Sequence, residues 1–261
     1  MKKLDLLHIT VLQTDIVWED PKANRKHFEE KINTLSSNTD LVILPEMFTT
    51  GFTMKASEFA ETMDGKTVSL MQKIASEKQL AITGSLIIKE NNHYHNRLVF
   101  VHPSEKIEFY DKRHSFTLAK EHETYSSGTK KLLVDYKGWK ICPLICYDLR
   151  FPVWSRNTNN YDLLIYVASW PKKRIYAWDS LLKARAIENM SYTIGVNRIG
   201  KDALDFEYNG HSIGLDYLGK NISKENNEHD GIISFTIDKS HQDSMRQKLS
   251  FLNDKDIFRI Q

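Results

Sequence analysis

Two short segments of this chain are almost entirely apolar, and they limit the possible folds more than any other feature. Asp40–Leu44 contains the run LVIL, and Asp162–Ala168 contains the run LLIYVA. A strand with one face in water alternates apolar and polar residues, whereas uninterrupted apolar strands are typical of a sheet that is covered on both faces. The sequence therefore predicts a sheet enclosed between other layers of structure.

Helices alternate with strands along the rest of the chain. We predict helices at Pro21–Leu35, which Asp20 can cap, at Thr67–Lys78 and at Ala177–Ser191. The other predicted strands are Leu6–Gln13, Leu80–Lys89, Tyr94–Phe100, Lys106–Tyr110, Ile141–Ile145, Tyr192–Asn197, His211–Asp216 and Gly231–Ile237. This alternation is typical of mixed α/β layers. No repeat, low-complexity tract or linker interrupts it, so we expect a single domain over residues 1–261.

Composition excludes several classes of protein. Of the 261 residues, 41% are hydrophobic and 27% are charged, as in an ordinary globular protein. A net charge of +2 gives no reason to expect a nucleic-acid or membrane partner. No apolar segment has the length of a membrane span. Cys142 and Cys146 lie about 13 Å apart if their segment is a strand, too far for a disulfide, so we expect reduced thiols and a cytoplasmic location.

One of these cysteines lies where a nucleophile would be useful. The predicted strand Ile141–Ile145 is followed directly by Cys146, and Phe151-Pro152 then suits the start of a helix. A cysteine at such a strand end, beside free backbone N–H groups, can be a nucleophile with an oxyanion site next to it. A buried cysteine is, however, more often an inert core residue.

Two charged residues follow other predicted strands in the same way. Glu46 comes after Leu41–Pro45, and Lys112 comes after Ile107–Asp111. Ligand sites in layered α/β proteins form at the carboxyl ends of strands. If the three groups meet there, Glu46 can take the thiol proton, while Lys112 and the backbone N–H of Tyr147 stabilise an oxyanion. Taken singly, Glu46 and Lys112 also fit solvated turns, so these residues alone leave the function open.

Six segments, in order, resemble the nitrilase superfamily of carbon–nitrogen hydrolases. They are LPEMFTTGF, YDKRHSF, EHETYSSG, ICPLICYDLRFP, ASWP and LLKARAIENMSYTIGVNRIG. The resemblance implies that Glu46 is the general base, Lys112 stabilises the intermediate and Cys146 is the nucleophile. It also implies a four-layer α-β-β-α sandwich that commonly dimerises. We therefore expect a homodimer or higher homo-oligomer, in which the tail from about residue 240 either crosses to a neighbouring subunit or covers its own sheet.

The resemblance also implies a second glutamate beyond the lysine. Glu121, seven residues before Gly128, has the better spacing, and Glu123 is the alternative. Its implied role is to orient Lys112 and the substrate amide by hydrogen bonding.

Other charged residues are expected to do structural work. Asp148 and Arg150 can hold the nucleophile turn through charge-assisted hydrogen bonds. Arg185 and Glu188 are expected to pair within the fold. The histidines lack the spacing of metal ligands, and no glycine-rich phosphate loop appears, so we expect neither a metal nor a cofactor.

Within the superfamily, CYDLRFPVWSRN and ASWPKKRIYAWDSLLKARAIEN are most similar to the omega-amidase branch. That branch hydrolyses the terminal amide of 2-oxoglutaramate or 2-oxosuccinamate to the 2-oxo acid and ammonia. The substrate carboxylate calls for a cation, and we expect Arg174 rather than Lys172, because a guanidinium binds a carboxylate bidentately. The same basic run also fits a solvated turn. The apolar walls of the site are expected from Phe52, Phe116 and Trp170.

Three other functions compete with this one. The same chemistry can act on another small amide, an N-carbamoyl amine or a nitrile. A catalytically silent member of the family can serve as an interaction protein, although such a protein has no chemical need for Glu46, Lys112 and Cys146 together. A redox thiol protein is disfavoured, because Cys142 and Cys146 lack the spacing of a dithiol motif.

Overall fold

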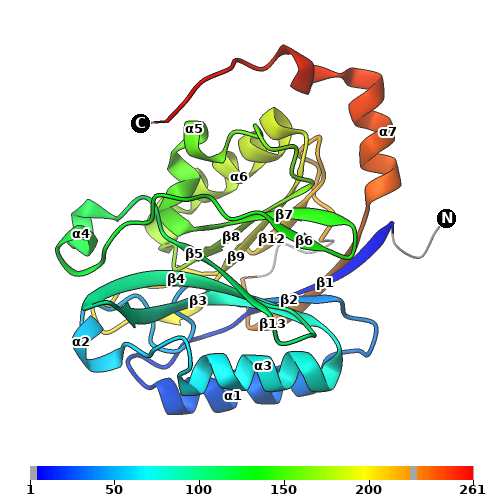
Figure 1. Cartoon of the computed structure of the whole chain (residues 1–261). Coiled ribbons are helices and arrows are strands. Elements are labelled where there is room, and N and C mark those ends of the chain that lie inside the picture. Colours follow the sequence, from blue (N-terminus) through cyan, green and yellow to red (C-terminus); the bar gives the residue numbers. More distant parts are fainter. Residues whose placement is uncertain (1–4, 224–227, 261) are drawn as a thin grey trace.

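Two sheets stacked face to face form the centre of the molecule (Figure 1). The computed structural model describes residues 5–223 and 228–260. In order, the first sheet consists of β13 (Gly231–Asp238), β1 (Leu6–Gln13), β2 (Leu41–Ile43), β3 (Ala81–Glu90), β4 (His93–Val101) and β5 (Ile107–Asp111). The second consists of β12 (Ile213–Leu215), β9 (Tyr192–Asn197), β8 (Leu163–Ala168), β7 (Trp139–Ile145) and β6 (Val134–Tyr136). A separate ribbon pairs β10 (Ile199–Lys201) with β11 (Glu207–Asn209).

Helices cover the outer face of each sheet. In Figure 1, α1 (Pro21–Asn33) and α3 (Lys66–Lys78) lie below the first sheet, and α5 (Pro152–Ser155) and α6 (Ile175–Asn189) lie above the second. The predicted cap is present, since the Asp20 carboxylate accepts a hydrogen bond from the N–H of Ala23 at 2.9 Å. Two shorter helices, α2 (Ala56–Phe59) and α4 (Glu121–Thr124), lie at one end of the sheets. The predicted four-layer α-β-β-α sandwich is confirmed.

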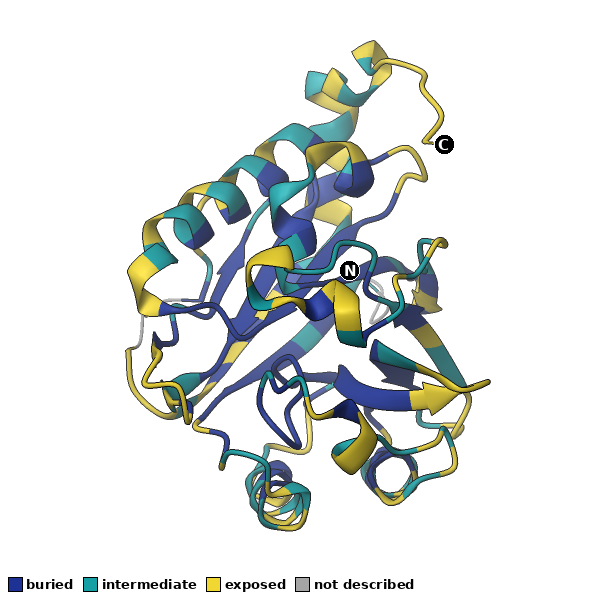
Figure 2. Cartoon of the chain, turned by 90° about the vertical axis from the view of Figure 1, so that its left-hand side faces the viewer, coloured by how far each residue is buried: buried dark blue, intermediate teal, exposed yellow. Residues whose placement is uncertain are grey.

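Two apolar clusters hold these layers together. The larger fills the space between the sheets and continues under α6, and the second lies between the first sheet and the helices α1 and α3. Both predicted apolar strands are fully buried. Figure 2 shows much of the central strands in dark blue, the colour of buried residues. β1, β2 and β3 run parallel, and so do β7, β8 and β9. In each sheet, the carboxyl ends of these three strands therefore lie side by side along one edge. That edge is where the candidate site lies.

The end of the chain forms a helix that the sequence did not predict, α7 (Lys239–Leu249). The buried Gln242 amide donates to the carbonyl oxygens of Asp162 and Met190, and Arg246 pairs with the Asp162 carboxylate at 3.0 Å. α7 therefore packs against the start of β8 and β9 of its own chain. Across residues 5–223 and 228–260, no helix is both long and apolar enough to cross a membrane.

Candidate active site

The Glu46 side chain accepts hydrogen bonds from donors that belong to both sheets. It lies three residues beyond β2, it is fully buried, and its Oε1 accepts hydrogen bonds from Lys112 Nζ at 2.9 Å and Asn96 Nδ2 at 2.8 Å. Its Oε2 accepts from the backbone N–H of Ser169, directly after β8 of the other sheet, at 2.9 Å. These donors fix the carboxylate in one orientation.

Lys112 is held between two carboxylates. It follows β5, and its ammonium donates to Glu121 Oε1 and Oε2 at 2.9 and 3.0 Å as well as to Glu46. Burial alone would lower the pKa of Lys112, but the charges of Glu121 and Glu46 outweigh it and raise the pKa above its ordinary value. Lys112 is therefore a permanent cation in this site.

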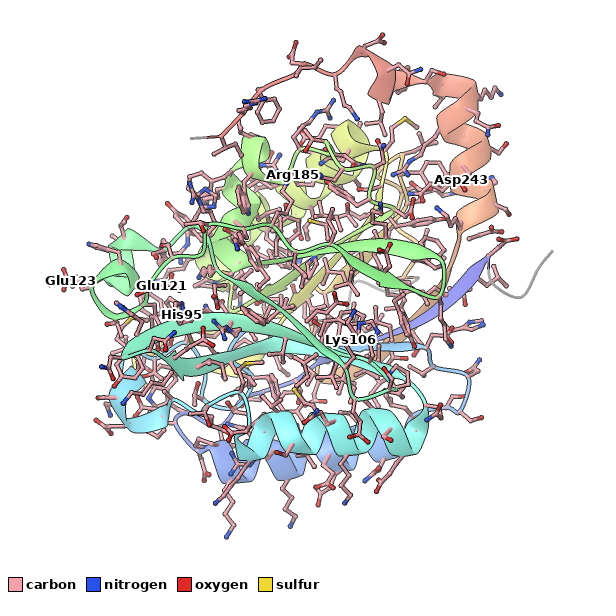
Figure 3. All side chains as sticks on the ribbon, in the orientation of Figure 1. His95, Lys106, Glu121, Glu123, Arg185 and Asp243 are labelled. Carbon is pink, nitrogen blue, oxygen red and sulfur yellow. The ribbon has the colours of Figure 1, made fainter. Side chains whose placement is uncertain are left out.

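Of the two glutamates considered for the neighbour of Lys112, Glu121 occupies that position. It is fully buried, and it also accepts from the backbone N–H of Phe116 at 2.5 Å. Burial raises the pKa of Glu121, and Lys112 partly offsets this effect. Glu123 is exposed at the outer side of α4 (Figure 3) and pairs with Lys120 at 3.9 Å.

Cys146 begins the turn after β7. It is the first residue of the 3-10 helix Cys146–Arg150, and its φ of 42° is unusual for a residue with a side chain. Burial and the charge of Glu46 both raise the pKa of Cys146 well above its ordinary value. The resting group is thus a neutral thiol beside an oriented carboxylate. The next N–H, that of Tyr147, is in the first turn of this helix and has no partner within it.

We expect the Cys146 thiol to remain protonated between about pH 6 and pH 9, because a raised pKa favours the protonated form throughout that range. The difference in ultraviolet thiolate absorbance between the wild type and Cys146→Ala should show no step below about pH 9. A step between about pH 5 and pH 7 would instead indicate a resting thiolate stabilised by Lys112.

Asp148 holds the nucleophile turn to the segment that carries Lys112. Its carboxylate accepts from Tyr110 Oη at 2.7 Å, from the N–H of His114 at 3.0 Å and from the N–H of Ile145 at 3.1 Å. The structural role expected for Asp148 is confirmed.

The same expectation was wrong for Arg150. Its guanidinium carbon lies 4.9 Å from the centroid of the Trp170 ring and forms no ion pair with a described residue. Arg150 lines the cavity described next, and among the described residues its side chain forms no hydrogen bond that would hold the turn. The expected pair of Arg185 and Glu188 is present, at 3.0 Å.

A cavity of about 600 Å³ opens at this edge of the sheets, a size that is ordinary for a small-molecule site. Glu46, Lys112 and Cys146 line it, and so do all four residues expected to contact the substrate, Phe52, Phe116, Trp170 and Arg174. Lys172, the alternative cation, does not line it and pairs with Glu207 at 2.8 Å. The cavity is also lined by Trp18, Met54, Leu118, Leu204 and Phe206.

Three contributors to the site were missed from the sequence. Asn96 donates to both Glu46 and Glu121, at 2.8 and 3.3 Å. In the sequence it lies in the middle of a strand and outside the motif segments, so nothing marked it as a site residue. Ser169 contributes a backbone N–H, which no residue type reveals. Arg150 lies within the CYDLRFP segment, but the sequence analysis gave it a structural role in the turn and not a place in the cavity lining.

The arrangement suits acyl transfer. A thiol, an oriented carboxylate and a fixed cation all line one cavity, as a nucleophilic attack on a carbonyl requires. Within the described part of the chain, no cluster of three or more histidine, cysteine, aspartate or glutamate residues could hold a metal ion.

Comparison with known proteins identifies the family. The carbon–nitrogen hydrolase family model matches residues 8–247, so this chain belongs to the carbon–nitrogen hydrolases. The omega-amidase YafV of Escherichia coli (strain K12) is 40% identical to it over 254 residues, which cover 97% of this chain and 98% of that protein. The 2-oxoglutaramate amidase of Bacillus subtilis (strain 168) is 33% identical over 257 residues, which cover 96% of this chain and 98% of that protein.

A solved structure agrees with this assignment. XC1258 from Xanthomonas campestris, a CN-hydrolase superfamily protein with an arsenic adduct in its active site, superposes with a TM-score of 0.95. It is 38% identical, over 98% of this chain and 99% of that one. The predicted membership of the superfamily and the resemblance to its omega-amidase branch are thereby confirmed.

Proposed function

We propose that this protein is a cysteine-dependent amidase that hydrolyses the terminal amide of a short 2-oxo dicarboxylate monoamide, 2-oxoglutaramate or 2-oxosuccinamate. The observation that carries the proposal is the convergence of Glu46, Lys112 and Cys146 on one cavity. The same cavity contains two arginines, Arg150 and Arg174, that pair with no acid among the described residues. The names of the omega-amidase and 2-oxoglutaramate amidase relatives support the same substrate class.

The reaction proceeds through a thioester. Cys146 Sγ attacks the amide carbon while its proton passes to Glu46, and the developing oxyanion is stabilised by Lys112 and the N–H of Tyr147. Glu46 returns the proton to the departing nitrogen, which leaves as ammonia. Glu46 then takes a proton from the water that attacks the thioester, and the 2-oxo acid and the thiol are released. Glu121 holds Lys112 in place throughout.

Ammonia release tests this proposal. The wild type is assayed with 2-oxoglutaramate and 2-oxosuccinamate beside glutamine, asparagine, an N-carbamoyl amine and an aliphatic nitrile, with Cys146→Ala as the blank. Cys146-dependent release from the two oxo-amides is the expected result. Turnover of a different amide alone would contradict the substrate and keep the mechanism, and silence on all of them would favour a non-catalytic role.

We assign Arg174 to the substrate carboxylate. Its guanidinium carbon lies 5.2 Å from the Phe116 ring, inside the cavity. Arg174→Ala should raise KM for 2-oxoglutaramate by about 10- to 100-fold, because a hydrogen-bonded ion pair to the substrate is lost, and should leave KM for butanamide within about twofold. Steady-state kinetics measures both values. Lys172→Ala is the matched control, since Lys172 points outside the cavity. An equal rise for both substrates would remove Arg174 from the carboxylate site.

We also propose a homodimer in the cytoplasm. Val153 on α5 and Ile187 on α6 are 55% and 54% exposed on the outer helical layer, where a second copy could cover them. Sedimentation equilibrium tests the dimer, and Ile187→Lys should weaken it. The two free cysteines suit a reducing compartment.

A further inference from the structure

The cavity contains two arginines that pair with no acid in the described part of the chain. Arg150 and Arg174 both line it, and among the described residues neither forms an ion pair or a side-chain hydrogen bond. The other cations differ, since Lys55 pairs with Glu19 at 2.7 Å and Lys112 lies between two carboxylates. Arginine is always charged and only donates hydrogen bonds, so these two side chains suit an anion or another strong acceptor in the ligand.

Aromatic rings hold both guanidinium groups in place. Arg150 lies over Trp170, which is 3% exposed and whose Nε1 donates to the carbonyl oxygen of Arg174 at 2.9 Å. Arg174 lies over Phe116, whose ring in turn packs edge-on against Tyr147, with centroids 5.0 Å apart. Stacking of this kind orients a guanidinium while leaving its N–H donors free for a ligand. Both arginines are therefore positioned before any substrate arrives.

Acidic groups in the cavity do not compete for these donors. Asp202 also lines it, but its carboxylate accepts from Tyr208 Oη at 2.8 Å and from the N–H groups of Leu204 and Phe206. Glu46 is occupied by its three nitrogen donors. Besides the reacting groups Glu46, Lys112 and Cys146, the cavity thus contains two arginines that pair with no described acid.

We propose that the two arginines together recognise the 2-oxo acid end of the substrate, Arg174 at the carboxylate and Arg150 at the 2-oxo oxygen. The assignment follows from the order of groups in the molecule, in which the 2-oxo carbon lies between the scissile amide and the carboxylate. Arg150 is on the same turn as Cys146, four residues on, whereas Arg174 directly precedes α6. This inference rests on the proposed function and extends it to substrate selection.

The consequence is discrimination against amino-acid amides. Glutamine has the same length as 2-oxoglutaramate but carries an ammonium group where the oxo group stands. Facing Arg150, that group would meet a like charge, and the guanidinium would lose its acceptor. Two free arginines therefore select a 2-oxo acid over the corresponding amino acid.

Substrate profiles of Arg150→Gln test the assignment. This variant keeps hydrogen-bond donors and removes the charge. We expect kcat/KM to fall about 10- to 100-fold for 2-oxoglutaramate, and by less than about threefold for 4-carbamoylbutanoate, which lacks the oxo group, and for butanamide. Arg174→Gln should instead lower the values for both carboxylates. The preference for 2-oxoglutaramate over glutamine should shrink only in Arg150→Gln, and Arg150→Lys should restore part of it.

Binding gives a second readout without turnover. In Cys146→Ala, calorimetry with intact 2-oxoglutaramate should show Kd rising about tenfold or more when Arg150→Gln is added, with no such change for 4-carbamoylbutanoate. A uniform loss across all three amides would overturn the role of Arg150 and leave it a structural residue. If the wild type hydrolyses neither oxo-amide, the proposed function fails first and the arginine assignment falls with it. The wild-type assay therefore tells the two failures apart.

Discussion

Cys146→Ala should reduce amide hydrolysis by at least about 10⁴-fold while shifting the melting temperature by no more than about 3 °C. Activity is lost because the variant lacks the thiol that forms the covalent intermediate. The fold is retained because Cys146 lines a cavity that already exists, and because Glu46 keeps its donors from Lys112, Asn96 and Ser169. Ammonia release and thermal unfolding measure the two effects on one preparation.

The second cysteine provides the matched control. Cys142 lies within β7 and belongs to the larger apolar cluster, is fully buried, and has its pKa raised to about 12 by burial. Cys142→Ser places a hydroxyl in an apolar site, which should cost about 1–3 kcal/mol of stability and leave turnover within about twofold. Loss of turnover in Cys142→Ser, with activity retained in Cys146→Ala, would mean that the nucleophile has been misassigned.

The strands and long helices could be predicted because local patterns determine them. LVIL and LLIYVA are buried on both faces in the structure, as their uninterrupted apolar character required. The predicted helix Ala177–Ser191 is found at Ile175–Asn189 and ends there because Met190 adopts a left-handed conformation, with φ of 44°. No apolar or turn signal marks that residue as a terminus.

The elements that were missed lack a local hydrophobic signal. α7 has the sequence KSHQDSMRQKL, and its only fully buried residue is Gln242, whose amide satisfies carbonyl groups at the strand starts. Met245 and Leu249 also pack against the larger apolar cluster, but two apolar residues in a helix of eleven are too few to predict it. β10 and β11 have three residues each, which is too short for alternation to be recognised.

Some residues of the candidate site could also be predicted from local patterns, and others could not. Glu46, Lys112 and Cys146 could be placed together because each follows a strand, and strand ends meet at one edge of a sheet. Asn96 could not, since only the pairing of β3 with β4 brings a mid-strand amide between Glu46 and Glu121. Arg150 was misassigned because its proximity to Asp148 in the sequence suggested that both hold the turn, whereas Asp148 bonds to Tyr110 and Arg150 lies against Trp170.

Lys112→Met should remove activity and destabilise the fold, for one electrostatic reason. The ammonium stabilises a developing oxyanion, so kcat should fall by roughly 10²-fold or more. It also neutralises Glu46 and Glu121, and breaking a buried charge cluster of this kind costs about 3–5 kcal/mol. Lys106→Met, at a 62% exposed side chain that pairs with Glu108 (Figure 3), is the control and should cost less than about 1 kcal/mol.

The pH dependence of the stability lost in Lys112→Met shows whether the cause is electrostatic. The pKa of Glu121 is already raised by burial in the wild type, and Lys112 is the charge that lowers it, so Lys112→Met raises it further. A carboxyl whose folded pKa exceeds its unfolded value contributes stability below the unfolded pKa of about 4.3, and this stability is lost as pH rises through the folded pKa. Urea unfolding should therefore show the gap between Lys112→Met and the wild type widening from about pH 5 to pH 8. A gap that stays constant over this range would mean that the two carboxylates do not depend on the charge of Lys112, and the loss would then reflect packing alone.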